Sequence, residues 1–69
     1  MIRIGERVYH KVYGSGVVVN SAVGQVEVKF DYYRDKDGNL HPNEPVELGI
    51  SQMEVVKTIW LPVATLEIA

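Results

Sequence analysis

The acidic side chains whose spacing comes closest to a metal-binding loop lie between residues 33 and 44. They match the third, fifth, sixth and twelfth positions of a helix-flanked calcium loop, and they are Asp35, Asp37, Gly38 and Glu44. The first position of such a loop needs an oxygen ligand, but Tyr33 occupies it. Because the flanking helices are also missing from the pattern, we predict a charged hairpin at this place and no metal site.

The two histidines, His10 and His41, are the other candidate metal ligands. A zinc site generally has three or four protein ligands, and the chain has no cysteine, so aspartate or glutamate would have to complete one. We expect the His10 ring to pack at the end of a strand and to bond to a backbone carbonyl, and His41 to be solvated. The sequence therefore predicts neither a metal nor another cofactor.

Gly14-Ser15-Gly16 contains the serine in the most suggestive setting, between two glycines. A nucleophile elbow needs G-x-S-x-G between a strand and a helix, and a phosphate loop needs a following lysine at a helix N-terminus. Neither pattern is present, and we predict no enzymatic activity. Since glycine adopts positive φ without a steric penalty, we predict instead that Gly14 and Gly16 make a tight reversal between two antiparallel strands.

Aromatic side chains are better suited to recognition, because they dominate interface hot spots and form the cages of Tudor-like domains. Tyr32 and Tyr33 are neighbours and must point to opposite faces of a strand, so at least one is expected at the surface, although Tyr32 and one or two others can also fill the core. Two basic residues lie close by in the sequence. The predicted binding residues are Tyr13, Tyr33, Trp60, Arg34 and Lys36.

Alternating residues between 23 and 32 indicate the strand that positions these side chains. One face is apolar and the other polar: Val26, Val28, Phe30 and Tyr32 against Glu27, Lys29 and Asp31. Two strands are expected before it. The first covers residues 2–10, with Ile4, Val8 and His10 at alternating positions and a bend at Gly5-Glu6 before the strand proper, and the second ends near Val19. The third strand is expected to end near Tyr33.

Residues 34–52 are predicted to leave this meander. The turn residues Asp37-Gly38 favour a hairpin, and the two prolines Pro42 and Pro45 exclude a regular helix and disfavour a central strand. A strand over 53–60 is expected next, but its period does not say whether Trp60 is buried. Pro62 should end it, followed by a short 3₁₀ turn over 63–66 and an edge strand at 67–68.

These elements predict an all-β fold, a small SH3-like or Tudor-like barrel of five to six antiparallel strands with an irregular insertion. The 69 residues form a single domain, 1–69, whose size permits only a modest core. With 46% hydrophobic and 23% charged residues, the chain has the composition of a globular protein. Gly14, Gly16, Gly38 and Pro62 are the residues with predicted structural roles.

Both ends of the chain carry a recognisable pattern of residues. The opening reads Gly5-x-x-Val8-x-His10-x-x-Tyr13-Gly14-x-Gly16-x-Val18, and the close reads Ile59-Trp60-Leu61-Pro62-Val63-x-x-Leu66-Glu67. In these segments the chain resembles the CarD-like group, which includes the RNA-polymerase-interacting domain of the transcription-repair coupling factor. It is also similar to the Tudor-like module at the C-terminus of UvrD/PcrA-type helicases.

The resemblance implies a bacterial domain that docks on RNA polymerase, in CarD-like proteins on the β subunit, and so regulates transcription. The insertion at 34–52 departs from the family, where the corresponding connection is usually shorter. The helical DNA-facing domain of CarD also has no counterpart in this sequence. The insertion therefore either changes polymerase binding or forms the site of another partner.

The leading hypothesis is thus a non-enzymatic protein-interaction module that binds its partner by edge strands and exposed aromatic side chains. One alternative is a nucleic-acid-binding small barrel, which the net charge of −2 and the scattered basic residues disfavour. Another is a small phage-encoded inhibitor of a host protein that uses the acidic insertion. No apolar run is long enough for a membrane span or a signal peptide, so we expect a cytoplasmic protein, monomeric or homodimeric.

Overall fold

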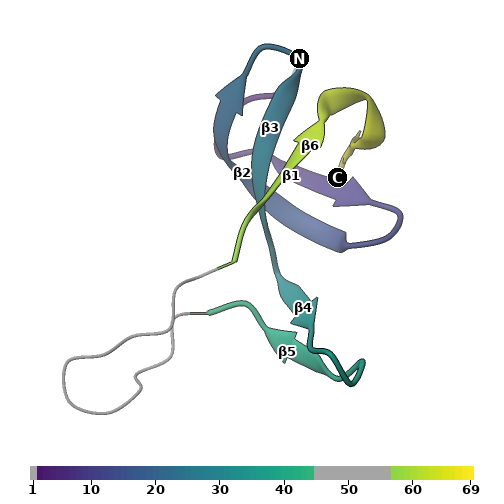
Figure 1. Cartoon of the computed structure of the whole chain (residues 1–69). Coiled ribbons are helices and arrows are strands. Elements are labelled where there is room, and N and C mark those ends of the chain that lie inside the picture. Colours follow the sequence, from purple (N-terminus) through teal and green to yellow (C-terminus); the bar gives the residue numbers. More distant parts are fainter. Residues whose placement is uncertain (1, 45–56) are drawn as a thin grey trace, which may run out of the picture.

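The computed structural model describes residues 2–44 and 57–69 of the chain. They form a small all-β fold in which antiparallel strands alternate with tight turns and one short 3₁₀ helix (Figure 1). The elements are β1 (Arg7–His10), β2 (Gly14–Ala22), β3 (Gln25–Phe30), β4 (Tyr32–Arg34), β5 (Leu40–Pro42), β6 (Ile59–Pro62), η1 (Val63–Thr65) and β7 (Glu67–Ile68).

The strands form two separate sheets. Five of them form an antiparallel sheet in the order β6-β3-β2-β1-β7, and β4 pairs with β5 in a separate two-stranded sheet. The larger sheet is open, with β6 and β7 at its two edges. The β4–β5 hairpin projects away from one end of this sheet (Figure 1). The predicted all-β class is confirmed, and the described part of the insertion contributes to the second sheet.

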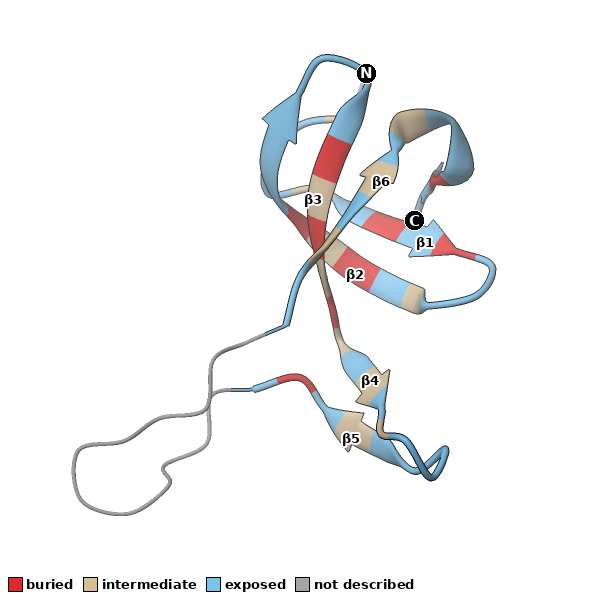
Figure 2. Ribbon diagram, in the orientation of Figure 1, coloured by how far each residue is buried: buried red, intermediate tan, exposed pale blue. Residues whose placement is uncertain are grey.

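The core lies on one face of the five-stranded sheet. Its buried residues come mainly from β1, β2 and β3, and they are Val8, Val18, Val26, Val28, Phe30 and Leu66. The predicted alternation of the third strand is confirmed as far as Phe30. In Figure 2 the buried positions are concentrated in the five-stranded sheet, whereas β4 and β5 carry only intermediate and exposed ones.

Tyr32 is not part of this core, and its predicted inward orientation is wrong. The third strand ends at Phe30 instead of Tyr33, because the chain bends at Asp31 and then enters the second sheet. There Tyr32 pairs with Pro42 and is 55% exposed. The insertion therefore begins two residues earlier than predicted, and its portion over 45–52 lies outside the described residues.

The N-terminal strand is shorter than predicted. It begins only at Arg7, and Ile4 is exposed, because the chain bends at Gly5, whose φ is +93°. The Gly5 N–H donates to the carbonyl of Val18 at 2.8 Å, which joins the bend to β2. The predicted bend is thus confirmed, and Ile4 does not share the buried face of Val8 and His10.

The two glycines of the first reversal have different roles. Gly14 has a φ of +86° and follows the turn at residues 11–13, as a glycine in a tight reversal should. Gly16 lies inside β2, where a Cβ would come within 2.8 Å of the carbonyl oxygen of Lys29 and within 2.9 Å of the Cα of Phe30. Its predicted turn role is wrong: Gly16 is required by the close approach of β3.

The second strand extends three residues beyond the predicted end at Val19. It continues to Ala22 past an irregularity in register between Val18 and Asn20, and it turns at Val23-Gly24, where the φ of Gly24 is +74°. A bulge bends a strand without ending its pairing, which is why the polar run after Val19 still belongs to the sheet.

The C-terminal segment follows the prediction closely. Pro62 is the last residue of β6, η1 makes the short 3₁₀ turn, and β7 pairs with the outer edge of β1. The predicted strand start near Met53 lies outside the described residues, and Lys57 and Thr58 precede the strand. No helix in the described part of the chain is long and apolar enough to cross a bilayer.

Candidate functional site

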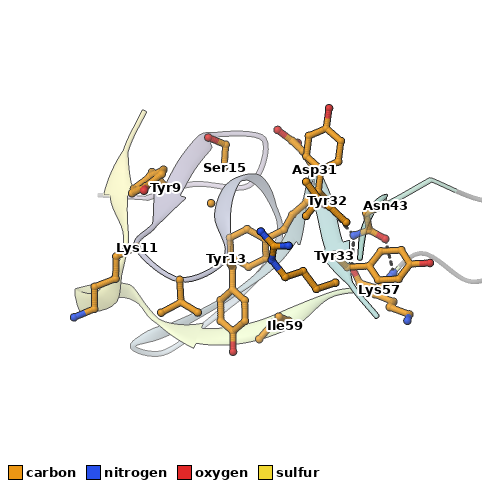
Figure 3. A pocket seen from close by; sticks show the side chains of 15 residues that line it. Tyr9, Lys11, Tyr13, Ser15, Asp31, Tyr32, Tyr33, Asn43, Lys57 and Ile59 are labelled. Atoms are coloured by element: carbon orange, nitrogen blue, oxygen red, sulfur yellow. Dashed lines mark hydrogen bonds between the residues drawn. The ribbon is translucent and has the colours of Figure 1, made fainter. Parts of the chain in front are cut away.

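An open groove of about 650 Å³ lies between the β1–β2 turn, the β4–β5 hairpin and the start of β6 (Figure 3). Four tyrosines and three basic residues give it its character, and they are Tyr9, Tyr13, Tyr32, Tyr33, Lys11, Arg34 and Lys57. Phe30 and Ile59 supply part of its apolar surface. Segments that are far apart in the sequence thus contribute side chains to one groove.

Tyr13 reaches the groove from the β1–β2 turn and is held there by an aromatic cluster. Its ring centroid lies 4.9 Å from that of His10 and 5.2 Å from that of Phe30. The buried His10 closes the turn: its Nδ1 accepts hydrogen bonds from the N–H groups of Val12 (3.0 Å) and Tyr13 (3.4 Å). His10 thus packs at a strand end as predicted, but it bonds to backbone amides and not to a carbonyl, because the turn points its N–H groups at the ring.

Tyr33 forms the opposite wall, from strand β4. Its ring stacks on that of His41 in β5, with centroids 5.4 Å apart. The Nζ atom of Lys57 lies 4.1 Å from the centroid of the Tyr33 ring, within the range of a cation–π interaction. Tyr33 is therefore fixed from both sides, and the ammonium group of Lys57 is placed at the groove.

Asp35 organises the turn of the hairpin. Its Oδ1 accepts from the N–H groups of Asp37 (2.9 Å) and Asn39 (3.0 Å), and its Oδ2 lies 2.7 Å from Nε2 of His41. These contacts lower the pKa of Asp35 to about 2, chiefly through the hydrogen bond with His41 and then that from the Asn39 backbone. The φ of Gly38 is +83°, as its predicted turn role requires.

Both carboxylate oxygens of Asp35 have partners within the hairpin. Oδ1 accepts from two backbone N–H groups, and Oδ2 contacts the ring of His41. Within residues 2–44 and 57–69, no three His, Asp or Glu side chains are grouped so as to hold a metal ion. The predicted charged hairpin is confirmed, whereas His41 is not simply solvated, because it contacts Asp35 and Tyr33.

Asn43 joins the two ends of the insertion. It is 3% exposed, and its Nδ2 donates to the carbonyls of Phe30 (2.8 Å) and Lys57 (2.7 Å), while its Oδ1 accepts from the N–H of Lys57 (3.0 Å). The N–H of Asn43 donates to the carbonyl of Asp31. Three separate chain segments are thus clamped at the base of the hairpin, which sets the width of the groove.

Arg7 and Asp31 form a second connection at this base. The Arg7 guanidinium donates to both carboxylate oxygens of Asp31, at 3.0 and 2.5 Å. This pairing is the main cause of the lowered pKa of Asp31. Asp31, the one acidic residue that lines the groove within residues 2–44 and 57–69, is thereby already paired with a cation.

The structure brings together three of the five predicted binding residues, Tyr13, Tyr33 and Arg34. Trp60 is 44% exposed and lies on the other face of β6, where it pairs with Glu27. Lys36 lies at the exposed tip of the hairpin and does not line the groove.

Sequence reasoning missed Lys11, Lys57 and Asn43 as residues of the site. Lys57 and Asn43 are separated by the 45–56 segment, and no period or motif links them. Tyr9 also lines the groove and is not among the predicted binding residues. The sequence gives one weak indication of the role of Asn43, which lies between two prolines. Asparagine side chains in such irregular segments often form hydrogen bonds with nearby backbone groups.

Comparison with known proteins adds nothing to this geometry: no family model, no curated protein and no solved structure matches the chain. The chemistry of the groove must therefore carry the functional argument. Tyrosine rings, lysines and an arginine around an open depression are suited to recognising an extended ligand with negative charge.

Proposed function

We propose that the chain is a non-enzymatic, SH3-like interaction module that binds a segment of a partner protein in the tyrosine-lined groove. The observation that carries the proposal is the groove itself, in which Tyr13 and Tyr33 form opposite walls and are each fixed by other rings. Rigid, partly exposed aromatic side chains lose little conformational entropy on binding, so they are effective anchors.

The connection between β6 and β7 supports the barrel-like part of this proposal. In a flat five-stranded sheet the two edges would lie about 19 Å apart, at about 4.8 Å per strand. The three residues of η1 rise only about 6 Å, at about 2 Å per residue. Because η1 and Leu66 link the two edges and Leu66 enters the core, the connection supports a curled sheet over a flat one.

The family resemblance makes bacterial RNA polymerase, through its β subunit, the partner to test first. The motif residues at the two chain ends have clear structural places: Val8, Val18 and Leu66 lie in the core, and Gly14 and Gly16 shape β2. Such residues favour the same fold, whereas the binding function depends on the surface that the fold displays. The groove is the part of that surface most suited to a protein segment.

Binding of purified bacterial RNA polymerase core enzyme and of its isolated β subunit, measured by biolayer interferometry, tests this function. We expect the wild-type chain to bind both, and Tyr13→Ala to weaken binding at least tenfold, the loss typical of an aromatic anchor. Trp60→Ala is the matched control, because Trp60 is equally exposed but lies on the opposite face.

Three outcomes separate the alternatives. Loss of binding in Tyr13→Ala alone supports the groove. Loss in Trp60→Ala alone places the polymerase contact on the outer face of β6. Absence of binding by the wild-type chain excludes polymerase as the partner.

A further inference from the structure

We infer that the groove takes an extended acidic peptide, with carboxylate side chains on both sides of an apolar or proline-containing centre. This inference rests on the proposed function and specifies the chemistry of the partner segment. It follows from three observations on the groove: its local charge, the order of its side chains, and the acidic residues around it.

The groove carries a positive charge that the chain as a whole does not. Lys11, Arg34 and Lys57 line it, and Asp31, the one acidic residue among the described residues of the lining, is paired with Arg7 outside the lining. The whole chain has a formal net charge of −2. Because the potential of the groove is opposite in sign to the net charge, a negatively charged ligand is attracted to the groove and not to the rest of the surface. Such a local match of charges is typical of electrostatic complementarity at interfaces.

Two of the three cations lie on opposite sides of the groove, whereas the Arg34 guanidinium donates to the carbonyl of Gly38 on the hairpin. In Figure 3, Lys11 lies on one side of the groove and Lys57 on the other, with Tyr13 and Ile59 between them. Tyrosine faces and an isoleucine side chain accommodate apolar or proline residues, as aromatic-lined grooves for proline-rich peptides do. A ligand that pairs with both lysines and covers the apolar surface between them therefore has an apolar centre and a carboxylate towards each end.

The surroundings of the groove favour a peptide over a nucleic acid. Asp35, Asp37 and Glu44 lie on the hairpin and just after it, and Arg34 already donates to the carbonyl of Gly38. A phosphate backbone that continued past the groove would approach these carboxylates. Affinity for nucleic acid depends on neutralising several successive phosphates, whereas a short peptide needs only the local cations.

Selection from a displayed library of random linear peptides tests the inference, with the purified chain as bait. We expect the enriched peptides to carry aspartate and glutamate on both sides of a proline- or leucine-containing centre, relative to the unselected library. A synthetic copy of an enriched peptide, labelled with fluorescein, then gives the affinity by anisotropy. Its copy with glutamine in place of each glutamate should bind about tenfold more weakly or worse.

Charge reversal at single positions assigns the effect to the groove. Lys11→Glu and Lys57→Glu should each weaken binding of the acidic peptide about tenfold, because an attraction becomes a repulsion. Lys36→Glu changes the net charge equally at the hairpin tip, outside the groove, and should have little effect. Circular dichroism of the three variants checks that each remains folded.

The outcomes distinguish failure of this inference from failure of the proposed function. If the enriched peptides lack acidic residues but their binding is still lost in Tyr13→Ala, the acidic ligand is overturned. The groove then remains the proposed protein-binding site. If Lys36→Glu weakens peptide binding as much as the two groove variants do, the inference is also overturned, because the affinity would then depend on the net charge and not on the groove. Binding of a single-stranded oligonucleotide without enrichment of any peptide overturns both.

Discussion

The five-stranded sheet and the β4–β5 hairpin are stabilised by different kinds of interaction. The sheet buries a cluster of valines with Phe30 and Leu66 on one face. The hairpin contributes no buried apolar residue, and its contacts are the Asp35 turn, the Tyr33–His41 stack and the Asn43 clamp. A two-stranded hairpin is marginal by itself in water. The region that forms half of the groove therefore depends on a few polar contacts, and it can be altered without unfolding the sheet.

Removal of an apolar side chain from the core should have the largest effect. Phe30→Ala should destabilise the chain by about 3–5 kcal/mol, a large part of the total stability of a domain of this size. Urea unfolding followed by circular dichroism measures the loss. Tyr32→Ala, two residues further on but 55% exposed, removes a side chain of similar size and should cost much less. If the two variants lost similar amounts of unfolding free energy, the sheet core and the hairpin would not differ in how much buried apolar contact stabilises them.

Asn43→Ala should affect the hairpin and leave most of the sheet unchanged. It removes three side-chain hydrogen bonds and leaves the buried carbonyl of Phe30 without that donor, at a cost of about 1–3 kcal/mol. Native-state hydrogen exchange should show faster exchange of the Asp35 N–H and unchanged exchange in β2 and β3. Asn39→Ala is the control, because Asn39 holds the turn through its backbone. Equal acceleration throughout the chain would contradict a local clamp.

Acid should open the hairpin before it unfolds the sheet. The pKa of Asp35 in the folded chain, about 2, is below the ordinary value of an aspartate, about 4. The ionised carboxylate therefore stabilises the folded hairpin above about pH 4, and this contribution is lost as the pH falls from about 4 to about 2. The amide chemical shifts of Gly38 and Asn39 in an NMR titration should follow this range.

Substitution of the acidic residues isolates the group responsible. Asp35→Asn should remove the pH dependence of the hairpin amides in this range. Asp37→Asn should preserve it, because Asp37 contributes its backbone N–H to the turn. If the core methyl signals of Val26 and Val28 changed at the same pH as the hairpin amides, the two regions would not open separately.

The smallest effect is expected from the contact between Lys57 and Tyr33. Lys57→Ala should destabilise the hairpin by about 0.5–1 kcal/mol, the value typical of an exposed cation–π pair. A double-mutant cycle with Tyr33→Leu isolates the pairwise part of this energy from other consequences of each substitution. Lys36→Ala at the tip should be nearly neutral. A coupling energy of zero would leave Lys57 a role in ligand binding alone.

Local patterns were sufficient for several elements of the fold. The alternation of Val26, Val28 and Phe30 predicted a half-buried strand, and the residues Asp37-Gly38 predicted the hairpin. Pro62 and the four residues after it predicted the end of β6 and the 3₁₀ turn. Each of these features depends on neighbours in the sequence, because period, turn conformation and proline geometry are properties of short segments.

Long-range contacts decided the rest. Tyr32 continues the apolar alternation in sequence, but pairing with Pro42 takes it out of the core. Gly16 has the appearance of a turn glycine, and only the approach of β3 explains its requirement. The groove depends on Asn43 bringing Lys57 beside the start of the hairpin.

The sequence by itself therefore determined the all-β class, the apolar alternation of β3, the hairpin turn at Asp37-Gly38 and the end of β6 at Pro62, since hydrophobic period and glycine or proline geometry act over a few residues. Only the tertiary structure decided that Tyr13, Tyr33 and Arg34 share a groove with Lys11 and Lys57, and that Trp60 faces away from it. The physical reason is that a binding surface is made by side chains from several strands, whose relative positions depend on register and on clamps between distant segments.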